Sequence, residues 1–367
     1  AISANPDSDI FAYNSRGDAK MKLGDYRGAL EDFDRGCGGQ VKISAKPTYP
    51  FAITVSRISS SYSGDPKARI DDMDKAISKN PDDAMAYLIR GDAKWWIDFD
   101  NHTGAMEDYD KAISIKPDEA RTYTGRAVAK YGLKDYKGAI GDYDKAISIK
   151  QSAVTYFNRA NAKYEINDYK GAIRDYNKAV SIEPSDAGKY INAGAYLNRG
   201  VAKYELGDKK GALADFDKAA GMPSFTDAAY NNRGGVKSAL GNTTGAVADF
   251  DKAIEKYYMW AYINRGDAKC CLGDYAGAVE DYDKVIAGDS KSAYAYANRG
   301  FARERLGETA GAKEDRAKAD SIDAGISEFY SNRGKIEFYR GEYKNALLDL
   351  ARAVFMNPFL KNQDKGR

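Results

Sequence analysis

The chain has 367 residues, 56 of them Lys or Arg and 54 Asp or Glu, so its formal net charge is only +2 at pH 7. The chain as a whole therefore lacks the strongly basic character typical of nucleic-acid-binding domains, and although this leaves a local basic stripe open, we expect no nucleic acid among its partners. With 43% hydrophobic residues the chain can build a core, yet no apolar run approaches the ~18 to 20 residues of a membrane-spanning helix.

One phrase recurs along the chain and organises it. A clear copy covers residues 261–286, which read Ala-Tyr-x-Asn-Arg-Gly-x-Ala-Lys, then Leu-Gly-Asp-Tyr-x-Gly-Ala, then Asp-Tyr-Asp-Lys. The arginine of the first phrase marks nine copies: Arg16, Arg90, Arg126, Arg159, Arg199, Arg233, Arg265, Arg299 and Arg333. The long interval between the first two contains one degenerate copy, so the sequence predicts about ten repeats.

Each copy predicts two helices joined by a tight turn. Aromatic and small residues recur at helical spacing, at Tyr262 and Gly266 in the first segment and at Ala278, Tyr282 and Val285 in the second. The glycine of Leu-Gly-Asp-Tyr suits the position just past a helix C-terminus. Because neither helix can bury its apolar stripe alone, the hairpins must stack on one another. The sequence therefore predicts an all-α solenoid of helix-turn-helix repeats.

In chain order, we expect an N-terminal extension at 1–10, a first repeat at 11–38 and an irregular insertion at 38–50. Nine further repeats follow, near residues 50–81, 85–117, 121–150, 154–184, 194–223, 228–256, 260–288, 294–322 and 328–358. A short tail at 359–367 ends the chain.

This helical hairpin resembles the tetratricopeptide repeat. The resemblance rests on Tyr262, Gly266, Ala278 and Tyr282 and their equivalents, and it covers roughly residues 11–358. It implies a right-handed superhelical solenoid whose inner groove binds a protein or peptide without catalysing a reaction. The chain departs from the family pattern in two ways. The family's usual apolar residue before the glycine is Arg here, and the closing proline occurs only as Pro81, Pro117, Pro184 and Pro358.

An aspartate in the second helix recurs as regularly as the arginine. All ten repeats carry it, as Asp32, Asp72, Asp108, Asp142, Asp175, Asp215, Asp249, Asp281, Asp315 and Asp349. A catalytic site would not need ten copies. We therefore expect a ladder of Arg–carboxylate pairs that joins the two helices of each hairpin.

Immediately before the arginine, the later repeats carry an unbroken series of asparagines: Asn158, Asn198, Asn232, Asn264, Asn298 and Asn332. In the resembled family this position points into the groove, and its Asn hydrogen-bonds the backbone of a bound peptide. A carboxamide suits that role because it offers both a donor and an acceptor. The alternative is a structural residue that is tolerated in the groove or bonds to the neighbouring helix.

Aromatic residues form a second candidate set of groove contacts. They lie four positions after the repeat's glycine or its alanine substitute, where the resembled family faces its inner surface: Trp95, Tyr131, Tyr164, Tyr204 and Phe338. We expect them to contact the ligand.

The last predicted helix, at 346–356, has an apolar face that the short tail cannot cover. Its apolar residues and the first residue of the tail are Leu347, Leu350, Val354, Phe355 and Phe359. Solenoids usually end in a helix with a polar outer face. The uncapped end predicts truncation, docking of a partner, or head-to-tail self-association into a fibre.

Few residues suit catalysis. His102 is the only histidine, which excludes His-dependent triads and multi-histidine metal sites within this chain. The stretch Asp98–His102 is interpreted as a solvated turn rather than a cation loop. Three cysteines, Cys37, Cys270 and Cys271, cannot form a disulfide framework and are interpreted as buried apolar residues. We expect no catalytic residue, no metal and no cofactor.

The leading hypothesis is a non-enzymatic scaffold that binds an extended peptide or partner protein along repeats five to ten. The second hypothesis is a structural subunit that assembles end to end. A start at Ala1 without Met leaves the compartment open between the cytoplasm, as the default, and export or an organelle. The glycosylation sequons at Asn101 and Asn242 say little without that information.

Overall fold

The computed structural model describes residues 66–97, 102–182, 188–222, 224–255 and 260–326. All regular secondary structure in these ranges is α-helical. The chain divides into two compact units, one of residues 46–225 and the other of residues 226–367 together with 1–45. The described part of the first unit is helices α4–α12, and that of the second unit is helices α13–α18.

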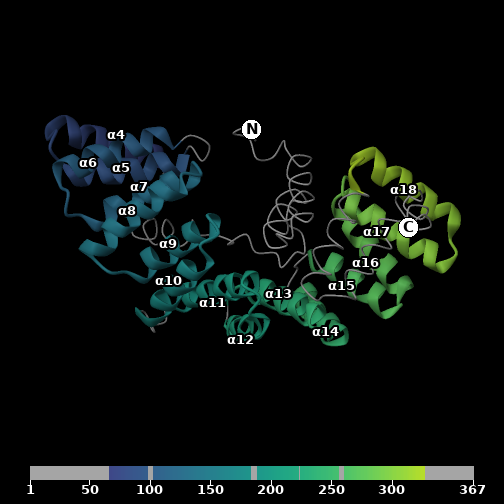
Figure 1. The fold of residues 1–367 in the computed structure, drawn as a ribbon. Helices are drawn as coiled ribbons and strands as arrows, with labels where there is room; N and C mark the ends of the chain where they lie inside the picture. The colour runs from purple at the N-terminus through teal and green to yellow at the C-terminus, as the bar shows by residue number, and fades with distance from the viewer. Residues whose placement is uncertain (1–65, 98–101, 183–187, 223, 256–259, 327–367) are drawn as a thin grey trace, which may run out of the picture. The chain divides into compact units, whose positions relative to one another are not determined.

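The first unit starts with α4 (Pro66–Lys79) and continues with four hairpins. The hairpins are α5 (Ala84–Ile97) with α6 (Thr103–Ile115), α7 (Ala120–Gly132) with α8 (Tyr136–Ile149), α9 (Ala153–Glu165) with α10 (Tyr169–Ile182), and α11 (Gly188–Glu205) with α12 (Lys209–Ala220). The two helices of each hairpin contact each other, and the second helix contacts the first helix of the next hairpin (Figure 1).

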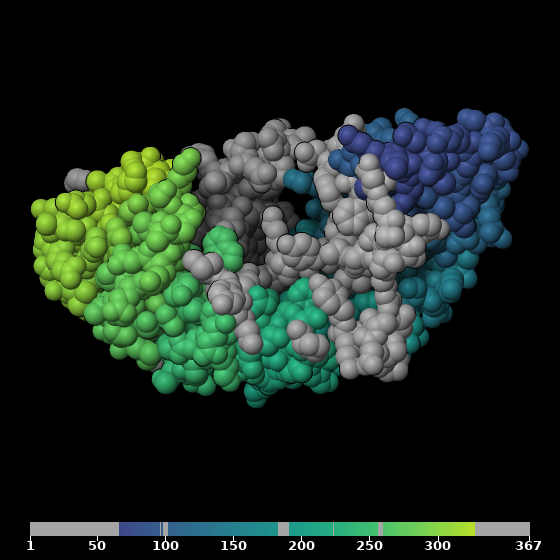
Figure 2. Space-filling view, turned by 180° about the vertical axis from the view of Figure 1, so that it is seen from behind, coloured from purple at the N-terminus to yellow at the C-terminus, as the bar shows by residue number. Residues whose placement is uncertain are grey.

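The second unit repeats this arrangement with three described hairpins. They are α13 (Thr226–Ala239) with α14 (Thr243–Glu255), α15 (Trp260–Leu272) with α16 (Tyr275–Gly288), and α17 (Ala293–Leu306) with α18 (Thr309–Ile322). In both units the first helices of successive hairpins also contact each other. Within the second unit, the space-filling view shows the described residues in chain order as bands of colour from green to yellow (Figure 2). The predicted fold class, an all-α solenoid of stacked hairpins, is confirmed.

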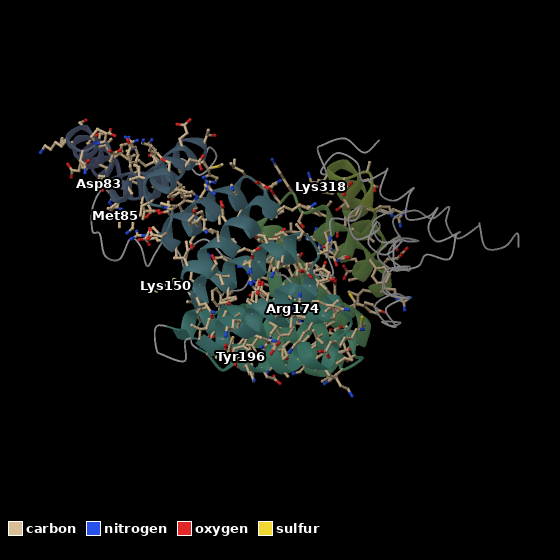
Figure 3. All side chains as sticks on the ribbon, turned by 60° about the vertical axis from the view of Figure 1, so that its left-hand side comes forward. Asp83, Met85, Lys150, Arg174, Tyr196 and Lys318 are labelled. Atoms are coloured by element: carbon tan, nitrogen blue, oxygen red, sulfur yellow. The ribbon has the colours of Figure 1, made fainter. Side chains whose placement is uncertain are left out.

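Polar caps and glycines set the turns. In the turn between α7 and α8, Asp135 accepts a hydrogen bond from the backbone N–H of Gly138 at 2.9 Å, which satisfies one of the free donors of the helix start. A Cβ on Gly138 would lie 2.0 Å from Oδ2 of Asp135, so the cap requires glycine there. Asp83 caps α5 through the N–H groups of Met85 and Ala86 (Figure 3).

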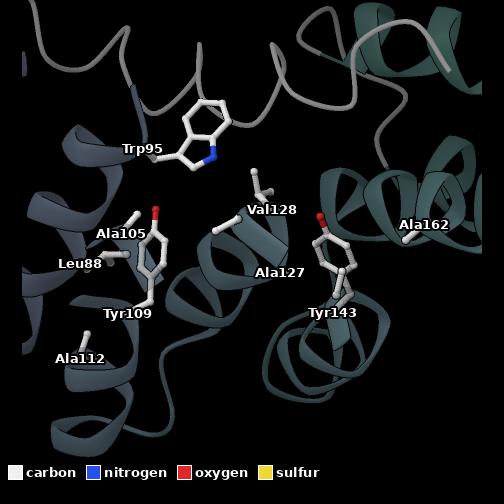
Figure 4. Close-up of a cluster of buried hydrophobic side chains, with 11 residues drawn as sticks. Leu88, Trp95, Ala105, Tyr109, Ala112, Ala127, Val128, Tyr143 and Ala162 are labelled. Atoms are coloured by element: carbon white, nitrogen blue, oxygen red, sulfur yellow. The ribbon is translucent and has the colours of Figure 1, made fainter. Parts of the chain in front are cut away.

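In six of the seven described hairpins, the core is an aromatic ring of the second helix pressed against a small residue of the first, whereas α18 has Arg316 at the position of the ring. A Cβ on Gly234 would lie 2.7 Å from Phe250, and one on Gly266 would lie 2.8 Å from Tyr282. These rings are among the largest fully buried side chains, a set that includes Tyr109, Tyr143, Tyr176, Tyr282, Phe216 and Phe250. Figure 4 shows two of them, Tyr109 and Tyr143, in the cluster that α5–α9 share.

Several predicted elements lie outside the described residues. They are the extension at 1–10, the repeat at 11–38, the insertion at 38–50, the first helix of the degenerate repeat, the repeat at 328–358 and the tail at 359–367.

Candidate functional site

The recurring arginine joins the two helices of every described hairpin, as the sequence predicts. In the α7–α8 hairpin, Arg126 donates from Nε and Nη2 to the two carboxylate oxygens of Asp142, at 2.8 and 2.6 Å. The same fork recurs in all seven described hairpins: Arg90–Asp108, Arg126–Asp142, Arg159–Asp175, Arg199–Asp215, Arg233–Asp249, Arg265–Asp281 and Arg299–Asp315. Two parallel bonds make this a bidentate, charge-assisted pair.

Sequence reasoning missed three further contacts of this ladder. Arg126 Nη1 reaches back to Asp110 of the preceding hairpin at 2.6 Å, and equivalent arginines reach Asp74, Asp144, Asn177, Asp251 and Asp283. Lys130, four residues on, adds a second cation to Asp142 at 2.8 Å. The guanidinium also lies over the ring of the tyrosine three residues earlier; Arg199 and Lys218 both lie over Tyr196. These charges are structural groups.

The asparagine series lies at the contact between successive first helices. Asn158, Asn198, Asn232 and Asn298 are each at most 2% exposed, and Asn264 is half-buried. Asn198 Nδ2 donates to Asn161 Oδ1 at 3.0 Å, so this carboxamide bonds to the preceding hairpin. Asn264 donates to Asn231 and Asn298 donates to Asp267 in the same way. The sequence leaves two roles open for these asparagines, contact with a bound peptide and a bond to the neighbouring helix. The bonds of Asn198, Asn264 and Asn298 are of the second kind. The series also spans both units, with Asn158 and Asn198 in the first and the others in the second.

A polar residue two positions after the arginine accepts the hydrogen bond of two of these asparagines, Asn198 and Asn298. Asn161 Oδ1 accepts from both Asn198 Nδ2 and the Tyr176 hydroxyl, the latter at 2.5 Å. Asp267 Oδ1 likewise accepts from Tyr282 at 2.7 Å and from Asn298 at 3.2 Å. The signal in the sequence was the pairing of Asp or Asn at this position with Tyr, rather than Phe, in the second helix.

In the α5–α6 hairpin the equivalent acceptor is a buried carboxylate. Asp92 accepts from the Tyr109 hydroxyl and from Arg121 of the next hairpin, both at 2.9 Å. Burial raises the pKa of Asp92 above its ordinary value, although Arg121 and Tyr109 act in the opposite direction. Burial and the Asp92 charge also raise the pKa of Tyr109. The hydroxyl therefore stays protonated and acts as a donor.

The predicted groove aromatics are largely packed within the protein. Trp95 is 3% exposed and stacks on His102 with ring centroids 5.8 Å apart; Tyr204 is also buried. Tyr131 donates to Glu165 at 3.2 Å, and Tyr164 makes an edge contact with Tyr169. Burial raises the pKa of both Tyr131 and Tyr164.

The structure corrects the prediction for His102 and supports the one for Cys270, and other predicted residues lie outside the described ranges. His102 is 3% exposed, so the prediction of a solvated turn is wrong for this residue, because Trp95 covers the imidazole. Of the two described cysteines, Cys270 is buried as expected and Cys271 is half-buried.

Some predicted residues lie outside the described ranges. They are Cys37, Asn332, Phe338 and the predicted assembly end, Leu347, Leu350, Val354, Phe355 and Phe359. The self-association hypothesis therefore stays a prediction.

The described residues contain neither a metal-binding cluster nor a membrane-spanning helix. Within those ranges, no three His, Cys, Asp or Glu side chains come together in a way that could hold a metal ion. In the same part of the chain, no helix is both long and apolar enough to cross a membrane.

Two stretches of the chain match family models of a helical repeat. Residues 153–186 match the family model described as tetratricopeptide repeat, and residues 266–307 match a second model described as TPR repeat. No curated protein sequence matches the chain.

Similar solved structures include other proteins of this kind. A tetratricopeptide repeat protein from Parabacteroides merdae is 20% identical, with 76% of this chain and 99% of that chain covered and a TM-score of 0.49. YrrB, described as a TPR protein with an unusual peptide-binding site, is 22% identical over 50% of this chain and 91% of its own, with a TM-score of 0.42. MamA is 25% identical over 46% and 94%, with a TM-score of 0.41. The matched repeats and the seven hairpins built on the same pattern identify this chain as a tetratricopeptide repeat protein.

Proposed function

We propose that this chain is a non-enzymatic protein-interaction scaffold that binds an extended polypeptide segment along the first helices of its hairpins. The observation that carries the proposal is a set of carboxamides bonded to the protein through only one of their two polar atoms. Asn198 donates from Nδ2 to Asn161, while its Oδ1 has no hydrogen-bond partner. Asn161 accepts through Oδ1, while its Nδ2 has none.

This pair offers one donor and one acceptor on adjacent first helices, α9 and α11. An extended backbone presents an N–H and a C=O that match such a pair whatever its side chains are. A buried polar atom without a partner destabilises the protein by about 1 to 3 kcal/mol. A peptide group that bonds to these atoms would remove that destabilisation. The hydrogen bonds that the folded chain leaves unmade would then contribute to the free energy of binding.

The second unit contains a related carboxamide. Asn232 is fully buried, its Nδ2 has no partner, and its Oδ1 accepts only a long 3.4 Å bond from Asn231. Its neighbour Asn264, by contrast, donates to Asn231 at 2.8 Å. Replacement of Asn232 therefore removes a weaker internal hydrogen bond than replacement of Asn264 does.

The test begins with an array of N-acetylated, C-amidated nine-residue peptides and continues with anisotropy titrations of the peptides it selects. We expect Asn232→Ala or Asn198→Ala to weaken binding about fivefold to tenfold, as loss of one hydrogen bond predicts. Asn232→Ala should leave thermal unfolding unchanged or slightly raised, because its removed donor had no partner.

The matched control is Thr244→Ala, an exposed position in the same hairpin as Asn232, which should change neither affinity nor unfolding. Wild-type affinity in both asparagine variants would refute a role for these carboxamides in binding.

A further inference from the structure

Six described hairpins, all but α17–α18, carry a second-helix aromatic ring, and in five of them this ring and the first-helix residue two positions after the arginine vary together. Where the ring is tyrosine, its hydroxyl donates to an Asp or Asn at that position: Tyr109 to Asp92, Tyr176 to Asn161 and Tyr282 to Asp267. Where the ring is phenylalanine, the position holds an apolar residue or glycine: Phe216 with Val201 and Phe250 with Gly235. Hydroxyl and acceptor occur together, as expected for buried polar groups.

The α7–α8 hairpin breaks this rule. Its ring is Tyr143, which is 1% exposed, but the residue two positions after Arg126 is Val128. No described side chain or backbone group accepts a hydrogen bond from the Tyr143 hydroxyl, whose pKa is raised chiefly by burial. Tyr143, Val128 and Ala162 belong to one buried cluster, and Figure 4 shows the hydroxyl pointing toward the space between Val128 and Ala162.

The equivalent positions indicate which atom would complete this arrangement. At Asn161 and at Asp267, one oxygen accepts from a tyrosine hydroxyl and from the asparagine of the next hairpin. In the α7–α8 hairpin that next asparagine is Asn158, which lies on α9 and is 1% exposed. A valine side chain ends at Cγ, one bond short of the Oδ atom that Asn161 extends to its donors. The missing element is one acceptor oxygen.

We propose that Tyr143, above Val128, forms a subsite for a carbonyl oxygen of the bound segment, from its backbone or from a carboxamide side chain. This inference rests on the proposed function and adds a position-specific contact to it. A neutral carbonyl suits the subsite better than a carboxylate, because Arg126 and Lys130 of this hairpin are both bonded to Asp142. A charge placed among Val128, Ala127 and Ala162 would be poorly solvated.

The first experiment tests the hydroxyl itself, without any peptide. Val128→Asn provides the acceptor that the other tyrosine-containing hairpins have. We compare the effect of Val128→Asn on the unfolding equilibrium constant in two backgrounds, wild type and Tyr143→Phe, by urea unfolding. In the wild-type background the substitution should be more stabilising, by a factor of about five in that constant. Absence of coupling between the two substitutions would overturn the inference, because the hydroxyl would then not be placed to meet an acceptor from this position.

The second experiment compares two tyrosines with the array-selected peptides. Tyr143→Phe should weaken binding about fivefold to tenfold while leaving stability unchanged or higher. Tyr109→Phe, the matched control, should lower stability because Asp92 loses a donor, while leaving affinity unchanged. Val128→Asn should also weaken binding, because its own carboxamide oxygen would occupy the subsite.

The outcomes separate the two proposals. Peptide binding that depends on Asn198 or Asn232 but is unaffected by Tyr143→Phe would overturn this inference and leave the proposed function standing. An array without a single binding peptide would count against both.

Discussion

Each described hairpin contains a buried aspartate in its second helix that is hydrogen-bonded to an arginine of the first, and in the α13–α14 hairpin these contacts affect the pKa of Asp249. Asp249 is 2% exposed. Burial alone would raise its pKa, but the hydrogen bonds from Arg233 and Lys237 hold the pKa below its ordinary value. Asp92 is also buried, yet its pKa is raised, because burial outweighs the contacts with Arg121 and Tyr109. Two buried carboxylates of one repeat family therefore respond to pH in opposite directions.

This difference predicts a pH dependence that distinguishes the two residues. The depressed pKa of Asp249 means that its contribution to stability is present above the unfolded pKa of about 3.9 and is lost as pH falls through the lower folded pKa. Asp249→Asn should therefore lower the free energy of unfolding by about 2 kcal/mol at pH 7, with the difference from wild type narrowing below about pH 4. Urea unfolding at a series of pH values measures it.

Asp92→Asn is the matched control, and its effect on stability at pH 7 should not be the loss expected for Asp249→Asn. The pKa of Asp92 is higher in the folded than in the unfolded chain. As the pH rises from the unfolded pKa to the folded pKa of Asp92, this residue therefore lowers the free energy of unfolding. The asparagine variant should be at least as stable as wild type at pH 7 and should lose that advantage in acid. A loss at pH 7 as large as that of Asp249→Asn would contradict this interpretation of the Asp92 environment.

At the scale of single helices, glycines have two different roles that the sequence alone does not separate. Gly234 of α13 lies against Phe250, and an added Cβ would also lie 3.1 Å from the backbone oxygen of Ala246. Gly141 of α8 is exposed, and an added Cβ would meet nothing within 4 Å. The first glycine allows the close packing of two helices, whereas the second only lowers the helix propensity of α8.

Alanine at these two positions should therefore have opposite effects. Gly234→Ala should destabilise the chain by about 1 to 3 kcal/mol, since the ring and the carbonyl leave no room for a methyl group. Gly141→Ala should stabilise it by about 0.5 to 1 kcal/mol, because alanine favours the helix more than glycine does. Urea unfolding of both variants tests the comparison. Equal effects of the same sign would show that the helix contact at Gly234 is looser than described.

At the scale of the whole molecule, the arginine ladder connects hairpins as well as helices, and its two connections differ in exposure. In the α9–α10 hairpin, the side chain of Asp175 is 6% exposed and bonds to Arg159 and Lys163. The side chain of Asp144, the partner of Arg159 in the preceding hairpin, is 57% exposed. The bond within the hairpin is shielded from water, whereas the bond between hairpins is open to solvent ions.

We therefore expect the ladder to stabilise hairpins far more than it stabilises their stacking. Asp175→Ala should destabilise the chain by about 3 to 5 kcal/mol, because it leaves two cations without their buried carboxylate. Asp144→Ala should cost less than about 1 kcal/mol, and 0.5 M NaCl should abolish that cost by screening the exposed pair. Urea unfolding at low and high salt decides between them. A salt-resistant effect of Asp144→Ala comparable with that of Asp175→Ala would be inconsistent with this division.

The stacking of hairpins must therefore depend mainly on apolar contacts between helices, as expected for a solenoid whose stability is a sum over neighbours. In the first unit these contacts include Tyr109, which lies close to Gly91 of its own hairpin and to Gly125 of the next. A Cβ on Gly125 would lie 2.8 Å from that ring, so the two hairpins approach closely at this position.

The sequence by itself determined the helical hairpin, its turn and the Arg–Asp pair, because these depend on residues that recur at fixed offsets within one repeat. Arg126 and Asp142 are 16 positions apart in a phrase repeated along the chain, so their pairing could be inferred without coordinates. Only the tertiary structure decided which groups meet across the boundary between repeats. Asn198 and Asn161 are 37 residues apart, and their bond depends on how two first helices are placed side by side.

The same reason explains what the sequence left open at the candidate site. Its asparagine series could be recognised, but a carboxamide that bonds a neighbouring helix and one that awaits a peptide look identical in sequence. The sequence shows a valine at position 128, but only the structure shows that the hydroxyls of Tyr109, Tyr176 and Tyr282 donate to the residue at the equivalent position. Periodicity fixed the repeat; the packing of one hairpin on the next decided which polar atoms have partners.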